Sequence, residues 1–263
     1  MTVAGEGFGT TELIRIDFGN KITITTTTSS SGGTFMAIFT VDTQPYGSTT
    51  VRARGVISWK TVEAVFRILP KIAYVNPTMG TVGSMVTVAG NGYRKNELVA
   101  IAFGMIRTIQ ITYANDTGSF VTTFTADTQP YGTTTISVFG LTSGVWACNT
   151  FFIHANIILL TPTYGTAGSI VTIRGNGYGA NEQVRITFGT TRTIQLTSTN
   201  VYGSFTTAFT INTQPYGTTT IMAAGLRTNA RADATFNIKS LDFYWIAMKK
   251  SVLEEQVEHL NGV

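Results

Sequence analysis

The chain has 263 residues and a net charge of +4; only 12% of its residues are charged, while 43% are hydrophobic. Enough apolar material for a packed core excludes a disordered chain, and a single cysteine excludes a disulfide framework. Because no uncharged apolar run approaches about 18 residues and the basic residues are scattered, we expect neither a membrane-spanning helix nor a nucleic-acid-binding surface.

An 85-residue repeat organises the sequence. The pentapeptide Thr-Gln-Pro-Tyr-Gly recurs at Thr43–Gly47, Thr128–Gly132 and Thr213–Gly217. A Gly-x-Gly-aromatic motif ends at Phe8, Tyr93 and Tyr178 with the same interval. A fixed period of this kind indicates a tandem array of one folding unit. The expected domains are residues 1–69, 70–154 and 155–239, followed by a C-terminal extension at 240–263.

The first domain is predicted to lack its first strand, because Met1 falls on Val86 in the repeat register. An internal methionine used as a start, or a truncated chain, would explain this. A signal peptide would then lie upstream. The unpaired strands would expose backbone and core side chains.

In the second repeat, apolar and polar residues alternate with period two between Gly, Asn and Pro clusters, which indicates half-buried strands. The predicted strands are at about 71–75, 84–90, 97–103, 106–112, 118–125, 133–140 and 145–153. Seven short strands in one repeat predict an immunoglobulin-like β-sandwich. The fold class is therefore all-β, with tandem sandwiches of about seven strands each.

The C-terminal extension departs from the repeat. From about Ile246, apolar residues at helical spacing predict a short helix. Three interpretations stay open for this extension: a cap on the last domain, a fragmentary tail, or a donated strand. In the third, Asp242–Trp245 aligns with Ile72–Val75 and fills the vacant strand position of another copy's first domain, which would build a fibre.

The segment from Pro162 to Gly189, with its Gly-Asn-Gly-Tyr turn and Phe-Gly corner, resembles the IPT/TIG type of immunoglobulin-like domain, and residues 77–104 resemble it too. The resemblance covers about residues 1–238. It implies a non-catalytic module of the kind found in tandem in prokaryotic surface proteins. Single copies of that family in secreted enzymes and transcription factors imply two alternatives, an accessory domain of a carbohydrate-active enzyme and a DNA-binding module.

The sequence offers little for catalysis. Cys148 and His154 lie on one predicted strand, about 20 Å apart, so they form no nucleophile–base pair, and Cys148 is expected to be a buried or half-buried structural residue. Asp42, Asp127 and Asn212 precede the recurring turns, where bonding to the turn backbone is favoured over calcium binding. We predict no enzyme, and no catalytic, cofactor or metal site. Residues Asn115–Thr117 form a glycosylation sequon.

The last inter-strand connection, residues 56–63, 141–148 and 226–233, keeps its length but changes its chemistry between repeats. Loops of this kind either present contacts to a partner or drift neutrally. The candidate contact residues are Trp59, Trp146, Arg227 and Arg231. The expected function is a spacer or adhesive segment of a larger extracellular or cell-surface protein, whose signal and anchor lie outside this chain. Expected partners are a surface protein or carbohydrate and adjacent domains of the chain; the oligomeric state stays open.

Overall fold

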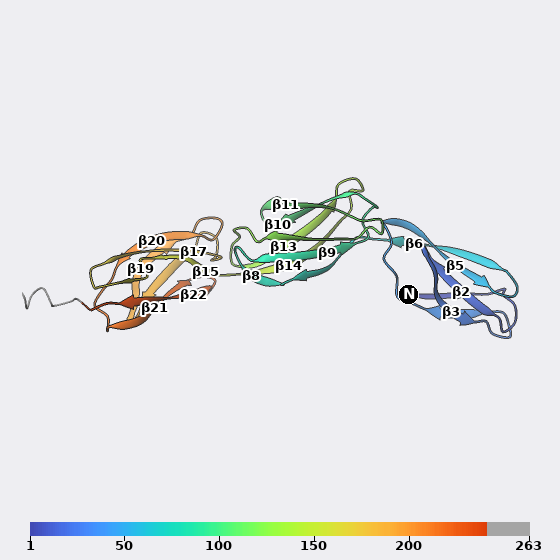
Figure 1. The fold of residues 1–263 in the computed structure, drawn as a ribbon, viewed down its shortest axis with the longest axis horizontal. Coiled ribbons are helices and arrows are strands. Elements are labelled where there is room, and N and C mark those ends of the chain that lie inside the picture. Colours follow the sequence, from blue (N-terminus) through green and yellow to red (C-terminus); the bar gives the residue numbers. More distant parts are fainter. Residues whose placement is uncertain (241–263) are drawn as a thin grey trace, which may run out of the picture. The chain divides into compact units, whose positions relative to one another are not determined.

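The computed structural model describes residues 1–240, and all of its regular elements are β-strands (Figure 1). By their contacts these residues form two units. The first contains residues 1–129 and 133–153; the second contains Pro130–Gly132 and the residues from His154 onward. The expected C-terminal helix lies outside the described residues. Each repeat has its own sheets and its own hydrophobic core.

The second repeat shows the complete sandwich. One sheet has the order β12-β9-β7 and the other the order β11-β10-β13-β14-β8. The strands are β7 (Lys71–Asn76), β8 (Met79–Thr81), β9 (Met85–Asn91), β10 (Leu98–Phe103), β11 (Ile106–Tyr113), β12 (Phe120–Thr125), β13 (Gly132–Gly140) and β14 (Trp146–His154). The seven predicted strands are all present, and the short β8 was not predicted.

The third repeat, in the second unit, has the same two sheets, β15-β17-β20 and β16-β22-β21-β18-β19. Its strands are β15 (Asn156–Thr161), β16 (Tyr164–Gly165), β17 (Ile170–Asn176), β18 (Gln183–Phe188), β19 (Thr191–Ser198), β20 (Phe205–Thr210), β21 (Gly217–Gly225) and β22 (Arg231–Ile238). In both repeats the first strand crosses from one sheet to the other: β15 pairs with β17, and β16 then pairs in parallel with β22.

The first repeat has six described strands. Its sheets are β1-β4 and β3-β2-β5-β6. The strands are β1 (Thr2–Gly5), β2 (Leu13–Phe18), β3 (Lys21–Thr28), β4 (Phe35–Ile38), β5 (Gly47–Gly55) and β6 (Thr61–Ile68). None of the described strands of this repeat corresponds to β7 or β8.

Alternating side chains build each core. In β10, Val99, Ile101 and Phe103 have no exposed surface, and Phe103 packs against Phe124 and Phe151 with ring centroids 5.2 and 5.8 Å apart. Period two places these residues between the sheets, where burial of apolar surface stabilises the fold. Cys148 does not belong to this core: it is exposed, so the expectation of a buried or half-buried cysteine was wrong. It follows an exposed Trp146 on a strand that lies at the surface there.

The Gly-x-Gly-aromatic turns close the ends of the sandwiches. Gly92 has a φ of 77°, and a Cβ there would lie 2.2 Å from the Leu69 carbonyl oxygen, so only glycine fits. Tyr93 is fully buried next to it. The Tyr93 carbonyl accepts a 2.8 Å hydrogen bond from the backbone N–H of Tyr46, in the recurring Pro-Tyr-Gly turn. The second unit repeats this contact between Tyr131 and Tyr178, at 2.9 Å.

Candidate functional site

A buried glutamate precedes the second long strand of every repeat. Glu12, Glu97 and Glu182 are 1%, 4% and 4% exposed. A buried carboxylate is costly unless its oxygens accept hydrogen bonds, so its partners reveal what it does. In all three repeats, one partner is a backbone N–H three residues before the glutamate, and the others lie in the loop before the last strand, which is the connection whose sequence varies.

Glu97 shows the arrangement in the second repeat. Its Oε2 accepts hydrogen bonds from the backbone N–H groups of Thr142 and Ser143, at 3.2 and 2.9 Å. Its Oε1 accepts one from the Ser143 hydroxyl at 3.0 Å and another from the Arg94 backbone N–H. One side chain therefore holds the tip of the β13–β14 loop, 45 residues away in the sequence, by three hydrogen bonds.

We call this arrangement, a buried glutamate with its hydrogen-bond donors in the loop before the last strand, the glutamate cage. The other repeats contain the same cage. Glu12 Oε2 accepts hydrogen bonds from the backbone N–H groups of Ile57 and Ser58 at 2.9 and 2.8 Å, and its Oε1 accepts one from the Ser58 hydroxyl at 2.5 Å. In the third repeat, Glu182 accepts from the N–H groups of Arg227 and Thr228 at 3.1 and 3.0 Å, and from the Thr228 hydroxyl at 2.8 Å. A serine or threonine hydroxyl is common to all three.

These donors stabilise the ionised carboxylate. The hydroxyl and backbone N–H of Ser58, with further amides, lower the pKa of Glu12 from 4.5 to about 2. Burial acts to raise the pKa of Glu182, but the donors of Thr228, Gly179 and Arg227 outweigh it, so the pKa of Glu182 is also lowered. Glu12 and Glu182 are therefore ionised at neutral pH and serve as fixed hydrogen-bond acceptors. A proton-transfer role would need a pKa near the working pH, and these shifts move away from it.

The cage leaves no room beside it. A Cβ on Gly140, where β13 ends, would lie 2.6 Å from Glu97 Oε1 and 2.5 Å from the Ser143 hydroxyl oxygen. Gly55 in the first repeat meets its glutamate at the same 2.6 Å. The glycine, the glutamate and the hydroxyl residue thus form one unit that fixes the loop backbone, while several of the other loop side chains project outward.

The outward side chains include the predicted contact residues. Trp59 is 76% exposed and has a φ of 59°, whereas the same position in the other repeats is occupied by Gly144 and Asn229. Glycine and asparagine tolerate that backbone conformation, but a bulky side chain does so with strain. Beside it, Ile57 is 74% exposed. The first repeat therefore presents an apolar tip on a strained backbone.

Trp146 and Arg231 occupy one register position, the first residue of β14 and of β22, and both are exposed. Arg227 is exposed too, and its guanidinium donates a 2.6 Å hydrogen bond to the Ala180 carbonyl beside Glu182. The four predicted contact residues lie on three different repeats. Their role as contacts stays a prediction.

Sequence reasoning noticed the recurring glutamates but did not assign the cage. The signal that could have found it is the constant spacing in all three repeats, where a glycine follows the glutamate by 43 residues and a hydroxyl residue follows it by 46.

The turn role of Asp42 and Asp127 is confirmed, because each carboxylate accepts a hydrogen bond from the backbone N–H of the next residue, at 2.8 and 2.6 Å. Asn212 differs and contacts Thr191 and Gln214 instead.

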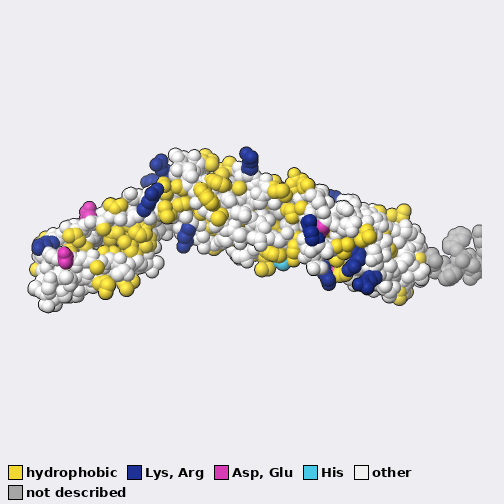
Figure 2. Space-filling view, turned by 180° about the vertical axis from the view of Figure 1, so that it is seen from behind, with side chains coloured by type: hydrophobic (Ala, Val, Ile, Leu, Met, Phe, Trp, Pro, Cys, Tyr) yellow, Lys and Arg dark blue, Asp and Glu magenta, His cyan; other side chains and the backbone are white. Residues whose placement is uncertain are grey.

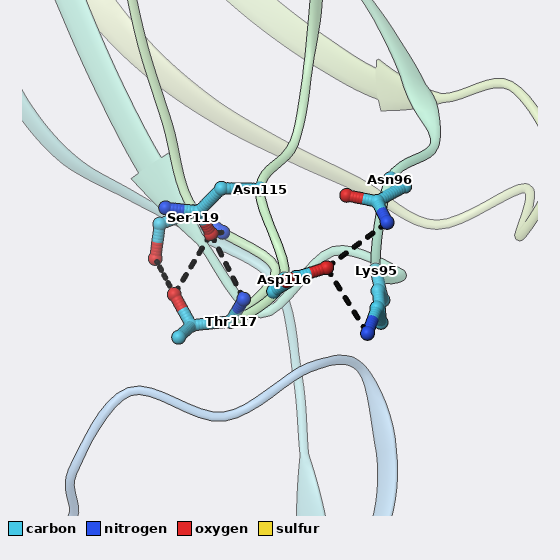
Figure 3. Close-up of polar contacts among 6 residues, drawn as sticks. All are labelled: Lys95, Asn96, Asn115, Asp116, Thr117 and Ser119. Atoms are coloured by element: carbon cyan, nitrogen blue, oxygen red, sulfur yellow. Dashed lines mark hydrogen bonds and ion pairs between the residues drawn. The ribbon is translucent and has the colours of Figure 1, made fainter.

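The sequon also has a structural explanation. Asn115 Oδ1 accepts hydrogen bonds from the Thr117 N–H and hydroxyl and from the Ser119 N–H, at 3.0, 2.8 and 3.0 Å (Figure 3). Next to it, Asp116 forms a 3.0 Å ion pair with Lys95 and accepts a 3.0 Å hydrogen bond from Asn96. In the third repeat Asn200 holds the same turn, so this asparagine shapes a loop.

The described residues contain no group of three or more His, Cys, Asp or Glu side chains placed to hold a metal ion. None of their elements is a helix of sufficient length and apolar character to span a bilayer. On the face shown in Figure 2, Lys and Arg side chains lie in separate positions along both units and form no continuous basic stripe. Hydrophobic side chains form several patches on that face.

Comparisons with known proteins give one family match and several similar structures. Residues 153–238 match the macroglobulin-like domain family. No curated protein matches the chain. Among solved structures, the chain is similar to a tetra-tandem repeat in the extending region of a large adhesion protein, with 15% identity, a TM-score of 0.31, and coverage of 92% of this chain and 70% of that one. The matched family is not the IPT/TIG type, which stays a prediction.

Two further structures are similar. The Bacteroides ovatus mixed-linkage glucan utilisation protein SGBP-B, solved with a heptasaccharide, has 12% identity and a TM-score of 0.28, with 90% of this chain and 63% of that chain covered. The Yersinia pseudotuberculosis adhesin InvE has 13% identity and a TM-score of 0.29, with 65% and 59% covered. The chain thus spans about three fifths of the length of these two structures.

Proposed function

We propose that the chain is a non-catalytic repeat segment of an extracellular or cell-surface protein, in which the loops held by Glu12, Glu97 and Glu182 contact a partner. The observation that carries this proposal is the combination of an unchanging cage with a changing tip. Fixing a loop before binding lowers the entropy that association costs, so a caged tip is suited to recognition. The proposed domains are residues 1–69, 70–154 and 155–239, of the immunoglobulin-like type.

The first tip favours a partner with an apolar or ring-shaped face. Ile57 and Trp59 are both exposed, and Ser58, which hydrogen-bonds to Glu12, lies between them in the sequence. Exposed tryptophan is a frequent centre of binding energy and stacks on flat apolar faces. A surface carbohydrate or a protein with a complementary apolar pocket would meet this requirement, and the adhesin and glycan-binding similarities are in keeping with it.

The test is a binding screen of the full chain on a glycan microarray and on an array of extracellular proteins. We expect binding that Trp59→Ala weakens at least about tenfold. Val65→Ala is the matched control, because Val65 is equally exposed at 76% on β6 but lies outside the caged loop. Loss of binding in both variants, or in neither, would contradict a contact role for the tip.

A further inference from the structure

The five-stranded sheet of the second repeat has an outer face that is rich in apolar side chains. Val99 and Ile101 of β10 lie in the core, so period two directs the side chain of Ala100, between them, to the outside. Ala100 pairs with Ile111 of β11 on one side and with Phe139 of β13 on the other. These last three residues therefore lie in one row across three strands.

The row continues onto β14. In the third repeat, Ala224 pairs with Arg231 at the positions that correspond to Phe139 and Trp146. Because β13 and β14 are neighbours in the second repeat too, Trp146 lies beside Phe139 on the outer face.

A second row adjoins the first. Leu98 pairs with Tyr113, and the backbone N–H of Leu141 donates a 2.9 Å hydrogen bond to the Leu98 carbonyl oxygen. We call the large side chains of the two rows the apolar face: Ile111, Phe139, Trp146, Leu98, Tyr113 and Leu141.

All six side chains of the apolar face reach solvent. Tyr113 and Trp146 are 67% and 60% exposed, and the exposed fractions of the other four lie between 36% and 55%. Since burial of an aromatic side chain removes about 150–250 Å² from solvent, the six side chains present on the order of 600 Å². A contiguous apolar patch of this size is at the upper end of what monomeric proteins expose, and it indicates an interaction site.

The other repeats have charged side chains at the same positions. In the first repeat, Arg15 and Arg54 replace Ala100 and Phe139 and pair with each other across two strands. The third repeat has Arg185 at the position of Ala100. The strands pair in the same register in all three repeats, so the fold itself does not require apolar residues here.

The apolar face also has a profile that is complementary to itself. Beside the row of Phe139 and Trp146 lies a row of small side chains: Ala102 pairs with Ser137, and Cys148 follows Trp146 by two residues on β14. A two-fold axis that runs along the boundary between these rows turns the large side chains of one copy onto the small side chains of the other.

We propose that a second copy of this chain packs on the apolar face, sheet against sheet, so that two chains form a symmetric dimer. With the adjoining row of small side chains, the apolar face approaches the about 800 Å² that each partner contributes to a standard interface. None of the residues in these three rows is charged, so two copies meet without the repulsion that Arg15 and Arg54 would produce between two first repeats.

The hydrogen-bonding groups of the apolar face favour this occupant over a carbohydrate. Its six side chains offer a glycan only the Tyr113 hydroxyl and the Trp146 indole N–H, whereas a glycan has many hydroxyl groups to satisfy. The apolar face of a second copy has no such requirement, and aromatic side chains without charges are typical of the centre of protein interfaces.

The inference goes beyond the proposed contact function and does not depend on it. The apolar face lies on the strands of the second repeat, and self-association is measured without any other partner. Trp59→Ala, which tests the contact function in the first repeat, should therefore leave dimerisation unchanged.

Sedimentation velocity of the full chain over a range of concentrations, under reducing conditions, tests the proposal. We expect a monomer–dimer equilibrium that ends at two copies, because a two-fold interface closes on itself. Phe139→Arg and Trp146→Arg should each weaken dimerisation at least about thirtyfold. Both variants should fold, because the first and third repeats have Arg54 and Arg231 at these positions.

Val121→Arg is the matched control. Val121 is 63% exposed on β12, which belongs to the other sheet of the same repeat, so the added charge should leave dimerisation unchanged. The thiol of Cys148 reports where the interface lies, because it is exposed beside the apolar face. Its alkylation should slow as the concentration of the parent chain rises, and should keep a constant rate in Phe139→Arg.

Four results would overturn the proposal: a parent chain that stays monomeric at all concentrations, dimerisation that survives Phe139→Arg, an equal loss in Val121→Arg, or a dimer in which Cys148 is alkylated as fast as in the monomer. A monomeric chain that binds a neutral polysaccharide, and loses this binding in Phe139→Arg, would also overturn it, because carbohydrate would then be the occupant of the apolar face.

Discussion

The first and second repeats have nearly the same strands from β2 and β10 onward, yet their cores are closed to different degrees. Phe103 of the second repeat is surrounded by Phe124 and Phe151, and Phe18 of the first by Phe39 and Phe66. The difference is at the open side, where β7 and β8 cover Phe151 and no described strand covers Phe66. The two cores are otherwise equivalent, so the strand that covers Phe151 accounts for the difference in their exposure to water.

The largest expected effect tests this difference directly. Phe151→Ala should destabilise the second repeat by about 3–5 kcal/mol, because it leaves a cavity among fully buried neighbours. Phe66→Ala should cost the first repeat about half as much or less, because the side chain already contacts water. Hydrogen exchange followed by mass spectrometry reports each repeat separately. Equal losses for both variants would show that the first core is as closed as the second.

Removal of the cage glutamate should lower the free energy of unfolding slightly less than Phe151→Ala does, and we expect a similar loss in both repeats. Glu97→Ala leaves the N–H groups of Thr142 and Ser143 without their acceptor, and we expect a loss of about 2–3 kcal/mol with faster exchange in the β13–β14 loop. Glu63→Ala is a control, because Glu63 is exposed and forms only a surface ion pair with Arg52. An unchanged loop in Glu97→Ala would contradict the role of the carboxylate.

Acid should lower the stability of the fold by protonating a cage glutamate. Because the pKa of Glu12 in the folded chain lies at about 2, below its ordinary value of 4.5, ionised Glu12 stabilises the fold above pH 4.5. This contribution is lost as the pH falls from about 4.5 to 2. Thermal unfolding over this range should show a smaller pH dependence for Glu12→Gln than for the parent chain. A parallel pH dependence would place the titrating group elsewhere.

The smallest expected effect has the opposite sign. Trp59→Asn replaces a strained residue with the one that the third repeat uses at this position, Asn229, so it should raise the stability of the first repeat by about 1 kcal/mol. Trp59→Val is the contrasting variant and should give no gain, since a β-branched side chain does not tolerate a positive φ either. Exchange of the amides in β5 and β6 measures the difference between the two variants.

Much of this fold follows from the sequence because the alternation and the turn glycines are local signals that recur three times. The strands of the second repeat and the turn role of Asp42 could both be predicted. The cage could not, because Glu97 meets Ser143 only after the sandwich brings together residues 46 positions apart. Cys148 was misjudged because an apolar residue type on a predicted strand does not tell which face it occupies. The short β8 carries too few residues for a periodic signal.

The glutamate cage has a consequence for how such a repeat diversifies. Since it requires only one glycine, one carboxylate and one hydroxyl group, the exposed residues of the tip can change while the cage is kept. Duplication followed by drift can thus generate new surface chemistries at a fixed location. For the same reason, a combinatorial library built at the exposed residues 57 and 60 should yield mostly folded members.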